Sequence, residues 1–247
     1  MADNDSNPSV SLRRLWLGLC PIRWCRLPPS LGREGELRRK TLGFRVFMNH
    51  HQKALRHLAK RDKVMAGLVK QIKLQPLAAR KNHFQSLVTS IISQQLSVKA
   101  AATIEQRFVD LFKGRFPSSS EILKKSDRVL RKSGLSGSKI SYIKNIAREV
   151  EQGRLNFKKL SKKSDEEIIA ELTQIKGIGR WTAEMFLIFS LRHLDIYSQG
   201  DLGLKNAVTK LYKINPKFHT RKLQTILENW KPYRSVASRL LWKSLEL

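Results

Sequence analysis

The chain has 247 residues, of which 41% are hydrophobic and 28% charged, a balance typical of a folded protein and too apolar for wholesale disorder. Its 48 Lys and Arg against 20 Asp and Glu give a formal net charge of +28, which favours polyanionic partners, nucleic acid above all. No apolar run approaches the roughly 20 residues of a membrane span, and two cysteines cannot build a disulfide framework or a four-thiolate metal site.

The first 47 residues differ in composition from the rest of the chain. They hold four of the eight prolines and both cysteines, Cys20 and Cys25. We expect residues 1–47 to form a basic, disordered leader with no catalytic role. Residues 48–247 still carry 39 Lys and Arg against 16 Asp and Glu, so the affinity for polyanions does not depend on the leader.

Helical periodicity dominates from about residue 49 onward, with no convincing run of alternating apolar and polar residues. Asn82 is a candidate N-cap, and an apolar stripe typical of a buried helix face follows it: Phe84, Leu87, Val88, Ile91 and Ile92. Ser97 can open a second helix, which runs through Phe112 and is closed by Gly114. These patterns predict an all-α fold with short connections.

More helices are predicted further along the chain. Ser164 and Glu167 fit a capping box, in which the hydroxyl reaches forward and the carboxylate reaches back, and they open a helix that extends to about Ile175. An apolar helix follows over residues 180–191. Pro232 suits the first position of a terminal helix, which carries Val236, Leu240, Leu241 and Trp242.

Two glycines flank one apolar residue in the turn Gly177-Ile178-Gly179, between two of these predicted helices. Such a turn brings the backbone close to another surface, and Ile178 can plug the space between the helices. The amides around Gly179 then point outward at a helix start, where Lys176 and Arg180 add positive charge. This arrangement can grip a DNA backbone without reading its sequence. The alternative is an ordinary hairpin of two helices with glycine caps.

Asp201 stands just before a helix predicted over residues 204–212. There it is expected to accept backbone amides and to face the positive end of the helix dipole. On its own, such an aspartate is simply an N-cap. An acid beside a phosphate-gripping hairpin nevertheless opposes the general attraction for DNA, and this placement makes sense if the carboxylate faces a cation that forms during a reaction.

Five motifs occur in order over about residues 80–247. They are residues 84–101, the turn Gly134-Leu135-Ser136 with Lys139, the glycine hairpin, the 20-residue spacing from Trp181 to Asp201, and residues 230–242. Together they resemble the helix-hairpin-helix DNA glycosylase superfamily, and most of all its alkylation-repair branch, 3-methyladenine DNA glycosylase II. The leader is unlike this family.

The resemblance implies two helical lobes with a DNA-binding cleft between them. Residues 82–197 would form the central lobe, ending with the hairpin, and residues 48–81 with 198–247 would form the second. The implied activity is hydrolysis of the N-glycosidic bond of alkylated purines of the 3-methyladenine and 7-methylguanine type, which starts base excision repair. The implied partner is double-stranded DNA containing alkylated bases, with no membrane, no obligate protein partner and no required cofactor. Such an enzyme works in the bacterial nucleoid or the eukaryotic nucleus.

The resemblance also implies a catalytic role for one acid. An alkylated purine already carries positive charge and leaves without a general acid, while an oxocarbenium-like cation develops on the sugar. The Asp201 carboxylate would stabilise that cation and could orient the attacking water. The residues expected to bind the electron-poor base are Trp181, Met185 and Trp242.

Contacts with the duplex follow in the same way. The side chain that fills the gap left by the extruded nucleotide would be Gln95 or Leu96. The residues implied to bind the DNA backbone are Lys176, Gly177, Ile178, Gly179, Arg180 and Thr182. The backbone carbonyls expected to hold a structural Na⁺ or K⁺ ion belong to Thr173, Ile175 and Ile178.

Two departures from relatives narrow the reaction. Relatives that also cut the strand have a lysine at the position of Trp181, and that lysine forms a Schiff base with the sugar. Trp181 cannot do so, which predicts a monofunctional glycosylase that leaves an intact abasic site. Cys20 and Cys25 also depart from the four-cysteine iron–sulfur pattern of several relatives.

Two alternatives stay open. The chain could excise oxidised or mismatched bases, although the missing lysine and cluster cysteines argue against most such branches. It could instead be a non-catalytic helix-hairpin-helix protein that only binds nucleic acid. Asp201 discriminates, because a pure binder gains nothing from an acid in its DNA-binding surface.

Overall fold

The structure is a computed structural model that describes residues 50–80 and 82–247. The expected leader, residues 1–47 with Cys20 and Cys25, lies outside the described residues. Within the described ranges the regular structure is entirely helical and contains no strand, which confirms the predicted all-α class. In the same ranges, no helix has the length and apolar character needed to cross a membrane.

The chain divides into two compact units, and the boundary falls after Ala183. Among the described residues, unit 1 contains 82–183 and unit 2 contains 50–80 and 184–247. The family resemblance implies a boundary after residue 197. Residues 184–197 belong instead to unit 2, because their partners lie there: Phe189 stacks on Trp242, and the Ile196 amide donates to the Ser235 hydroxyl over 2.9 Å.

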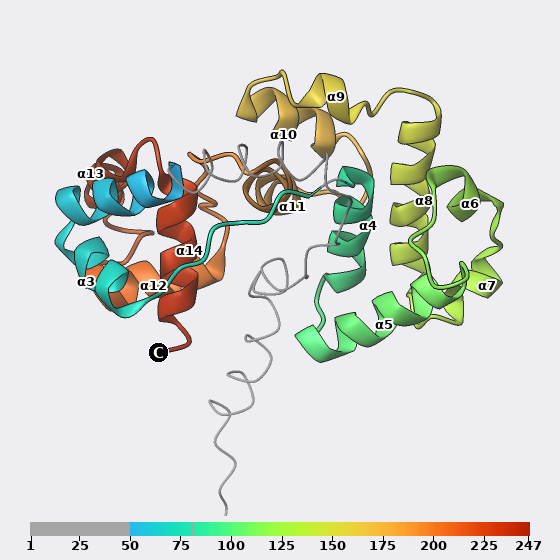
Figure 1. Cartoon of the computed structure of the whole chain (residues 1–247), viewed down its shortest axis with the longest axis horizontal. Helices are drawn as coiled ribbons and strands as arrows, with labels where there is room; N and C mark the ends of the chain where they lie inside the picture. Colours follow the sequence, from blue (N-terminus) through green and yellow to red (C-terminus); the bar gives the residue numbers. More distant parts are fainter. Residues whose placement is uncertain (1–49, 81) are drawn as a thin grey trace, which may run out of the picture. The chain divides into compact units, whose positions relative to one another are not determined.

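Helix α8 (Gly137–Glu151) is the centre of unit 1. It packs against α4 (His83–Ser93), α6 (Ser119–Lys124) and α7 (Asp127–Arg131), as Figure 1 shows. Its inner face is fully buried and consists of Ile140, Ile143, Ile146 and Ala147. Helix α5 (Val98–Asp110) packs on α4, while α9 (Phe157–Leu160) and α10 (Asp165–Thr173) follow α8 along the chain.

The helix starts predicted in unit 1 are confirmed by their caps. The Asn82 side chain accepts the Gln85 amide over 2.9 Å, and the Ser97 side chain accepts the Ala100 amide over 3.2 Å. Both halves of the capping box are present at Ser164 and Glu167. Each such cap satisfies a backbone donor that the helix itself leaves without a partner. The predicted ends are less accurate, because α5 stops at Asp110, and α10 stops at Thr173.

Helix α14 (Arg234–Ser244) is the centre of unit 2 (Figure 1) and packs against α3 (Lys63–Gln71), α12 (Leu202–Tyr212) and α13 (Thr220–Trp230). A further helical stretch, residues 50–61, precedes α3. The prediction that α14 begins at Pro232 is wrong by two residues. Its first amides find partners in a distant loop: the Arg234 amide donates to Asp195 over 3.2 Å, and the Ser235 amide donates to the Leu194 carbonyl over 2.9 Å.

One buried acid ties three helices of unit 2 together. Asp62 caps α3, where one carboxylate oxygen accepts the amides of Val64 and Met65 over 2.8 and 3.0 Å. Its other oxygen accepts the Tyr212 hydroxyl over 2.7 Å and the Trp230 indole N–H over 2.9 Å, from α12 and α13. Burial and the negative charge of Asp62 raise the pKa of Tyr212, so this phenol stays protonated.

The apolar helix predicted over residues 180–191 consists of two parts. Helix α11 (Arg180–Phe186) continues into a π-helical turn, η2 (Leu187–Leu191). The turn ends at Arg192, which has a left-handed backbone with φ of 62°. Because the turn is wider there, the amides of both Arg192 and His193 donate to the Leu187 carbonyl.

Candidate active site

Asp201 lies at the N-terminus of α12, as predicted, although the helix begins at Leu202 rather than at Leu204. Its Oδ1 accepts the Leu204 amide over 2.8 Å and the Trp242 indole N–H over 2.9 Å. The residue is only 5% exposed. The carboxylate is therefore fixed by two donors, one from its own helix and one from α14.

Gly203 leaves room for this carboxylate–indole pair. A Cβ atom at Gly203 would lie 3.1 Å from Asp201 Oδ1 and 3.2 Å from Trp242 Cδ1, tighter than ordinary van der Waals contact. Trp242 itself is 4% exposed, and its ring stacks on Phe189 with centroids 5.7 Å apart. Its indole thus contacts Phe189 with one face and Asp201 with its N–H, while stacking of Trp242 on a base stays a prediction.

Tyr197 is a neighbour of Asp201 that is not among the predicted site residues. Burial, and then the negative charge of Asp201, raise the pKa of the Tyr197 phenol. Its ring packs against Trp230 with centroids 5.9 Å apart. The phenol is therefore a neutral, protonated group close to the candidate catalytic carboxylate.

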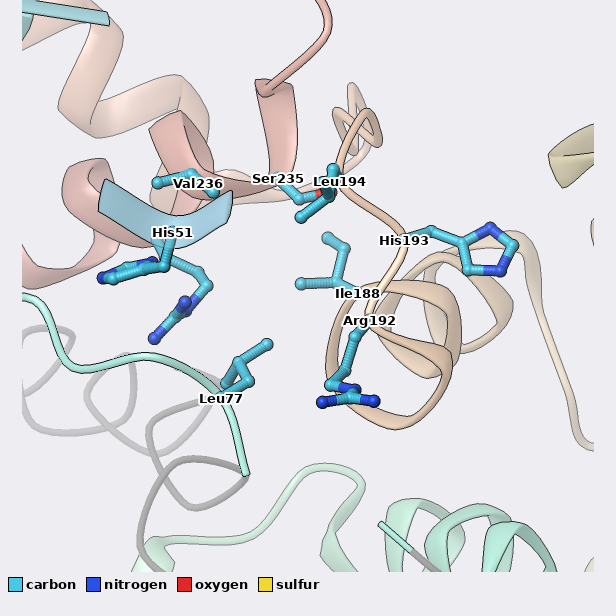
Figure 2. A pocket seen from close by; sticks show the side chains of 9 residues that line it. His51, Leu77, Ile188, Arg192, His193, Leu194, Ser235 and Val236 are labelled. Atoms are coloured by element: carbon cyan, nitrogen blue, oxygen red, sulfur yellow. The ribbon is translucent and has the colours of Figure 1, made fainter. Parts of the chain in front are cut away.

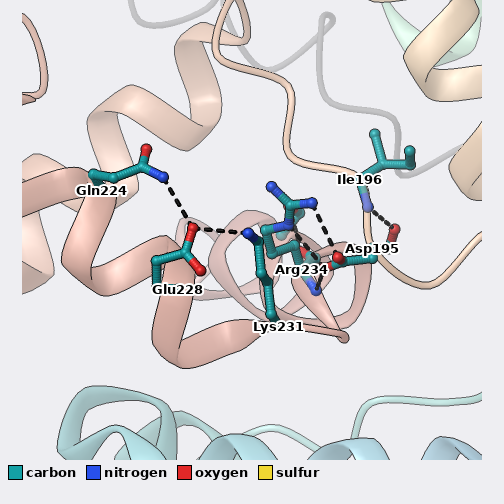
Figure 3. A network of polar contacts seen from close by, with 8 residues as sticks. Asp195, Ile196, Gln224, Glu228, Lys231 and Arg234 are labelled. Atoms are coloured by element: carbon teal, nitrogen blue, oxygen red, sulfur yellow. Dashed lines mark hydrogen bonds and ion pairs between the residues drawn. The ribbon is translucent and has the colours of Figure 1, made fainter. Parts of the chain in front are cut away.

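The loop that leads into Asp201 is anchored along its length. Arg234 binds Asp195 through two side-chain hydrogen bonds of 2.8 and 2.9 Å, and the Ser235 hydroxyl accepts the Ile196 amide (Figure 3). Figure 3 also shows Glu228 accepting from Gln224 and Lys231 beside this loop. Because the loop has partners on α14, the position of Asp201 does not depend on its helix alone.

Trp181 and Met185, the other residues expected to bind the base, differ in exposure. Trp181 is half-buried in the first turn of α11. Met185 is almost fully buried. Among the predicted base-binding residues, Trp181 therefore offers more accessible surface than Met185 or Trp242.

The predicted hairpin connects α10 to α11 in unit 1. Gly177 has φ of 108°, and a Cβ atom there would lie 2.3 Å from the Tyr142 ring, so only glycine fits. Ile178 and Ile175 are buried, and the Ile178 amide donates to the Ile175 carbonyl over 2.9 Å. Ile178 is thus buried, while its place between the two helices stays a prediction.

The outer side of the hairpin carries three of the predicted DNA-binding residues. Lys176, Gly179 and Arg180 are exposed, and a Cβ atom at Gly179 would meet no atom within 4 Å. Arg180 forms an exposed ion pair with Glu166, with an N–O distance of 2.8 Å. Thr182, in contrast, is buried. The open surface over Gly179 lets a flat or extended ligand approach the backbone.

The turn between α4 and α5, residues 94–97, carries the two residues expected to fill the gap left by the extruded nucleotide, and we call it the wedge turn. Gln95 is exposed and has a left-handed backbone with φ of 55°, while Leu96 is half-buried. The neighbouring Gln94 points its amide toward the hairpin and donates to the Gly177 carbonyl over 3.3 Å and to the Thr182 hydroxyl over 3.4 Å. Within unit 1, the wedge turn and the hairpin are thus joined directly.

Lys139 holds the same turn from α8, a contact that sequence reasoning missed. Its Nζ donates to the carbonyls of Ile92 and Gln94, over 2.8 and 2.7 Å, at the C-terminal end of α4. A cation suits the negative end of a helix dipole. Burial lowers the pKa of Lys139. The signal in the sequence was the Gly134–Lys139 motif, which marked the residue without indicating its partners.

Figure 2 shows a small pocket in unit 2 that contains none of the predicted site residues. The apolar side chains of Leu77, Ile188, Leu194 and Val236 line it, and the ring of His193 points away from them. His51 also lines the pocket, and it donates to the Leu74 carbonyl over 2.9 Å, which anchors the irregular segment of residues 72–80. In the described part of the chain, no group of three His, Cys, Asp or Glu side chains could hold a metal ion.

Comparison with known proteins gives a consistent picture. The model of a family described as HhH-GPD superfamily base excision DNA repair protein matches residues 88–232. DNA-3-methyladenine glycosylase 1 of Schizosaccharomyces pombe is 38% identical over 171 residues, which cover 68% of this chain and 75% of that protein.

Two solved structures are similar over most of their length. The DNA-3-methyladenine glycosidase of Bacillus halodurans has a TM-score of 0.69 at 38% identity, over 77% of this chain and 88% of that one. The 3-methyladenine DNA glycosylase of Schizosaccharomyces pombe, in complex with abasic DNA, has a TM-score of 0.70 at 36% identity, over 79% of this chain and 97% of that one.

Proposed function

Because the chain belongs to the HhH-GPD superfamily of base excision DNA repair proteins, we propose that it is a DNA glycosylase that removes alkylated purines from double-stranded DNA. The substrates are bases of the 3-methyladenine and 7-methylguanine type. The names of the similar proteins, DNA-3-methyladenine glycosylases from a yeast and a bacterium, support this substrate class. The complex of one of them with abasic DNA supports DNA as the partner.

The observation that carries the proposal is the Asp201 carboxylate. In a chain with a net charge of +28, this acid is buried and held by the Leu204 amide and the Trp242 indole. A buried N-cap can serve the fold alone, as Asp62 does, but beyond capping a protein that only binds DNA has no use for the charge of Asp201. A glycosylase has one, because a cation develops on the sugar as the base leaves.

The chemistry follows from the charge of the substrate. An alkylated purine is already positive, so it departs without being protonated by the enzyme. As the bond from the base to C1′ breaks, its electron pair leaves with the base, and positive charge grows on the sugar. Asp201 stabilises that charge and orients the water whose oxygen then bonds to C1′ while its proton is released. Trp181 contacts the electron-poor base.

The outer side of the hairpin is proposed to bind the DNA backbone. Lys176 and Arg180 supply charge, and Gly179, where a Cβ atom would meet no atom within 4 Å, allows close approach, whereas Gly177 packs against Tyr142. We also propose that the carbonyls of Thr173, Ile175 and Ile178 hold a Na⁺ or K⁺ ion. Backbone carbonyl oxygens are ligands that suit such ions, and the second lone pair of the Ile175 carbonyl is compatible with its bond to the Ile178 amide.

Asp201→Asn is the test of the catalytic assignment. The amide oxygen of asparagine can still accept from Leu204 and Trp242, so the fold and the affinity for DNA are retained. Release of 3-methyladenine and 7-methylguanine from duplex treated with dimethyl sulfate falls by roughly 100-fold or more, since the stabilising charge is gone. Chromatography of the released bases measures the rate, and fluorescence anisotropy measures the binding.

Asp62→Asn is the matched control for this variant. Asp62 is also a buried N-cap in unit 2 that accepts a tryptophan N–H over 2.9 Å. This control loses stability, yet each folded molecule excises at the wild-type rate. Near-normal excision by Asp201→Asn would overturn the assignment of Asp201.

We further propose that the enzyme has no strand-cutting lyase activity. Trp181 has no amine, so it cannot form a Schiff base with the sugar. Borohydride added during the reaction therefore traps no covalent complex between protein and DNA on a denaturing gel, and the product strand stays intact until alkali is added. A trapped complex would mean that a lysine elsewhere acts as nucleophile.

A further inference from the structure

Glu184 is a buried acid on α11 that the proposed mechanism does not use. It is 5% exposed, and its neighbours in the chain, Ala183, Met185 and Phe186, are buried as well. A carboxylate in such surroundings is costly unless specific donors compensate it. An apolar side chain would satisfy packing alone, so the acid requires another explanation.

A hydrogen-bond partner of Glu184 connects it to the candidate active site. The hydroxyl of Ser198, which is fully buried, donates a hydrogen bond to the Glu184 carboxylate. The backbone carbonyl of the same serine accepts the Asp201 amide over 3.1 Å. All three residues belong to unit 2. Ser198 therefore connects the buried acid of α11 to the turn that presents Asp201.

We propose that Glu184 is a positioning residue for Asp201, acting through Ser198. The hydrogen bond fixes Ser198, the turn of residues 198–201 closes on its carbonyl, and the Asp201 carboxylate keeps its direction at the start of α12. Trp242 then completes the arrangement from α14. This inference rests on the proposed glycosylase function, because a carboxylate needs an accurate position only if it acts on a reacting group.

Ser198→Ala is the first test, because it removes one oxygen and little volume. The single-turnover rate of base release from methylated duplex falls roughly 10- to 100-fold, as expected when a reacting group is misplaced. The Kd for the duplex stays within about twofold, since the DNA-binding residues of unit 1 are unchanged. Ser133→Ala is the matched control: Ser133 is also fully buried, but its hydroxyl donates to the Leu130 carbonyl of α7, and its loss leaves the rate unchanged.

Variants of Glu184 separate positioning from general destabilisation. Glu184→Gln keeps an oxygen that accepts the Ser198 hydroxyl and excises within about threefold of wild type. Glu184→Ala loses that acceptor and resembles Ser198→Ala. The losses of Ser198→Ala and Glu184→Ala are not additive, and Ser198→Ala adds nothing in an Asp201→Asn background. Circular dichroism shows whether each variant is folded. If Glu184→Ala does not fold, the comparison of Ser198→Ala with Glu184→Gln still tests the proposal.

The outcomes distinguish this inference from the proposed function. If wild-type protein releases no methylated base, the proposed function fails. If wild-type protein is active and Ser198→Ala is equally fast, only the positioning role fails. A loss confined to DNA binding, additive losses, or a Glu184→Gln variant as slow as Glu184→Ala would each overturn it as well.

Discussion

The contact between Trp242 and Asp201 changes what the tryptophan is expected to do. A residue that stacks on the extruded base needs an accessible ring face, whereas Trp242 is buried against Phe189 and uses its N–H on the carboxylate. Gly203 lies against both Asp201 and Trp242, and a larger residue there would crowd this pair. At the scale of single residues, the proposed mechanism therefore involves the donors that hold Asp201 as well as Asp201 itself.

Trp242→Phe separates the two roles of this residue. Phenylalanine keeps an aromatic ring on Phe189 but loses the N–H donor to Asp201. A hydrogen bond to a charged group contributes roughly 1.5–3 kcal/mol, so we expect excision to slow by about tenfold or more with DNA binding retained. Single-turnover kinetics with methylated duplex measure the loss.

The control for this variant is Trp230→Phe. Trp230 donates to Asp62 over the same 2.9 Å, in a part of unit 2 that supports the fold. We expect its loss to lower the midpoint of thermal unfolding and to leave the excision rate of folded molecules unchanged. A full excision rate in Trp242→Phe would show that an aromatic face is sufficient and that the hydrogen bond contributes nothing.

At the scale of elements, unit 1 joins the wedge turn to the hairpin. The side chain of Gln94 reaches the Gly177 carbonyl, and Lys139 of α8 holds the Gln94 carbonyl and the end of α4. The left-handed backbone at Gln95 follows directly. On the proposed function, one connected structure therefore both binds the DNA backbone and fills the gap that the extruded nucleotide leaves.

Lys139→Met tests this connection. Methionine retains much of the length of the side chain but donates to neither carbonyl, so the turn loses its support. We expect a loss of about 1–3 kcal/mol in the free energy of unfolding, measured by urea denaturation. We also expect weaker base extrusion, measured by 2-aminopurine fluorescence beside the lesion in the Asp201→Asn background.

Lys144→Met on the same helix is the control, because its partner Asp127 is exposed and such ion pairs contribute little. Its stability and base extrusion should match those of the parent protein. If Lys139→Met also matches the parent in both measurements, the support from α8 is irrelevant to the turn.

At the scale of the whole molecule, local signals in the sequence predicted helix starts well and long-range contacts poorly. Asn82, Ser97, Ser164 and Asp201 were recognised as caps because each acts on an amide three residues away. The prediction from Pro232 is wrong because α14 begins at Arg234, whose amide donates to Asp195, 39 residues earlier in the chain. Turn chemistry is local, whereas tertiary partners are not.

The candidate site follows the same division. The candidate catalytic acid and the glycine hairpin are predicted from pattern and family resemblance, and the structure places Asp201 at its predicted cap. The residues that hold this acid did not stand out, because Trp242 is 41 residues from Asp201 and the bond from Ser198 to Glu184 crosses 14 residues. Burial, which makes Glu184 unusual, is a property of the folded chain and not of its local sequence.

The division into units also determines the order in which their parts are synthesised and can fold. The described part of unit 1, residues 82–183, is one continuous stretch, and it is synthesised before residues 184–247 of unit 2. Asp62 accepts hydrogen bonds from Tyr212 and Trp230, which follow it by 150 and 168 residues, and Asp201 accepts one from Trp242, which follows it by 41 residues. Domains fold as units during synthesis. We therefore expect the hairpin, the proposed DNA-binding element, to fold before Asp201, the proposed catalytic acid, gains its donor Trp242.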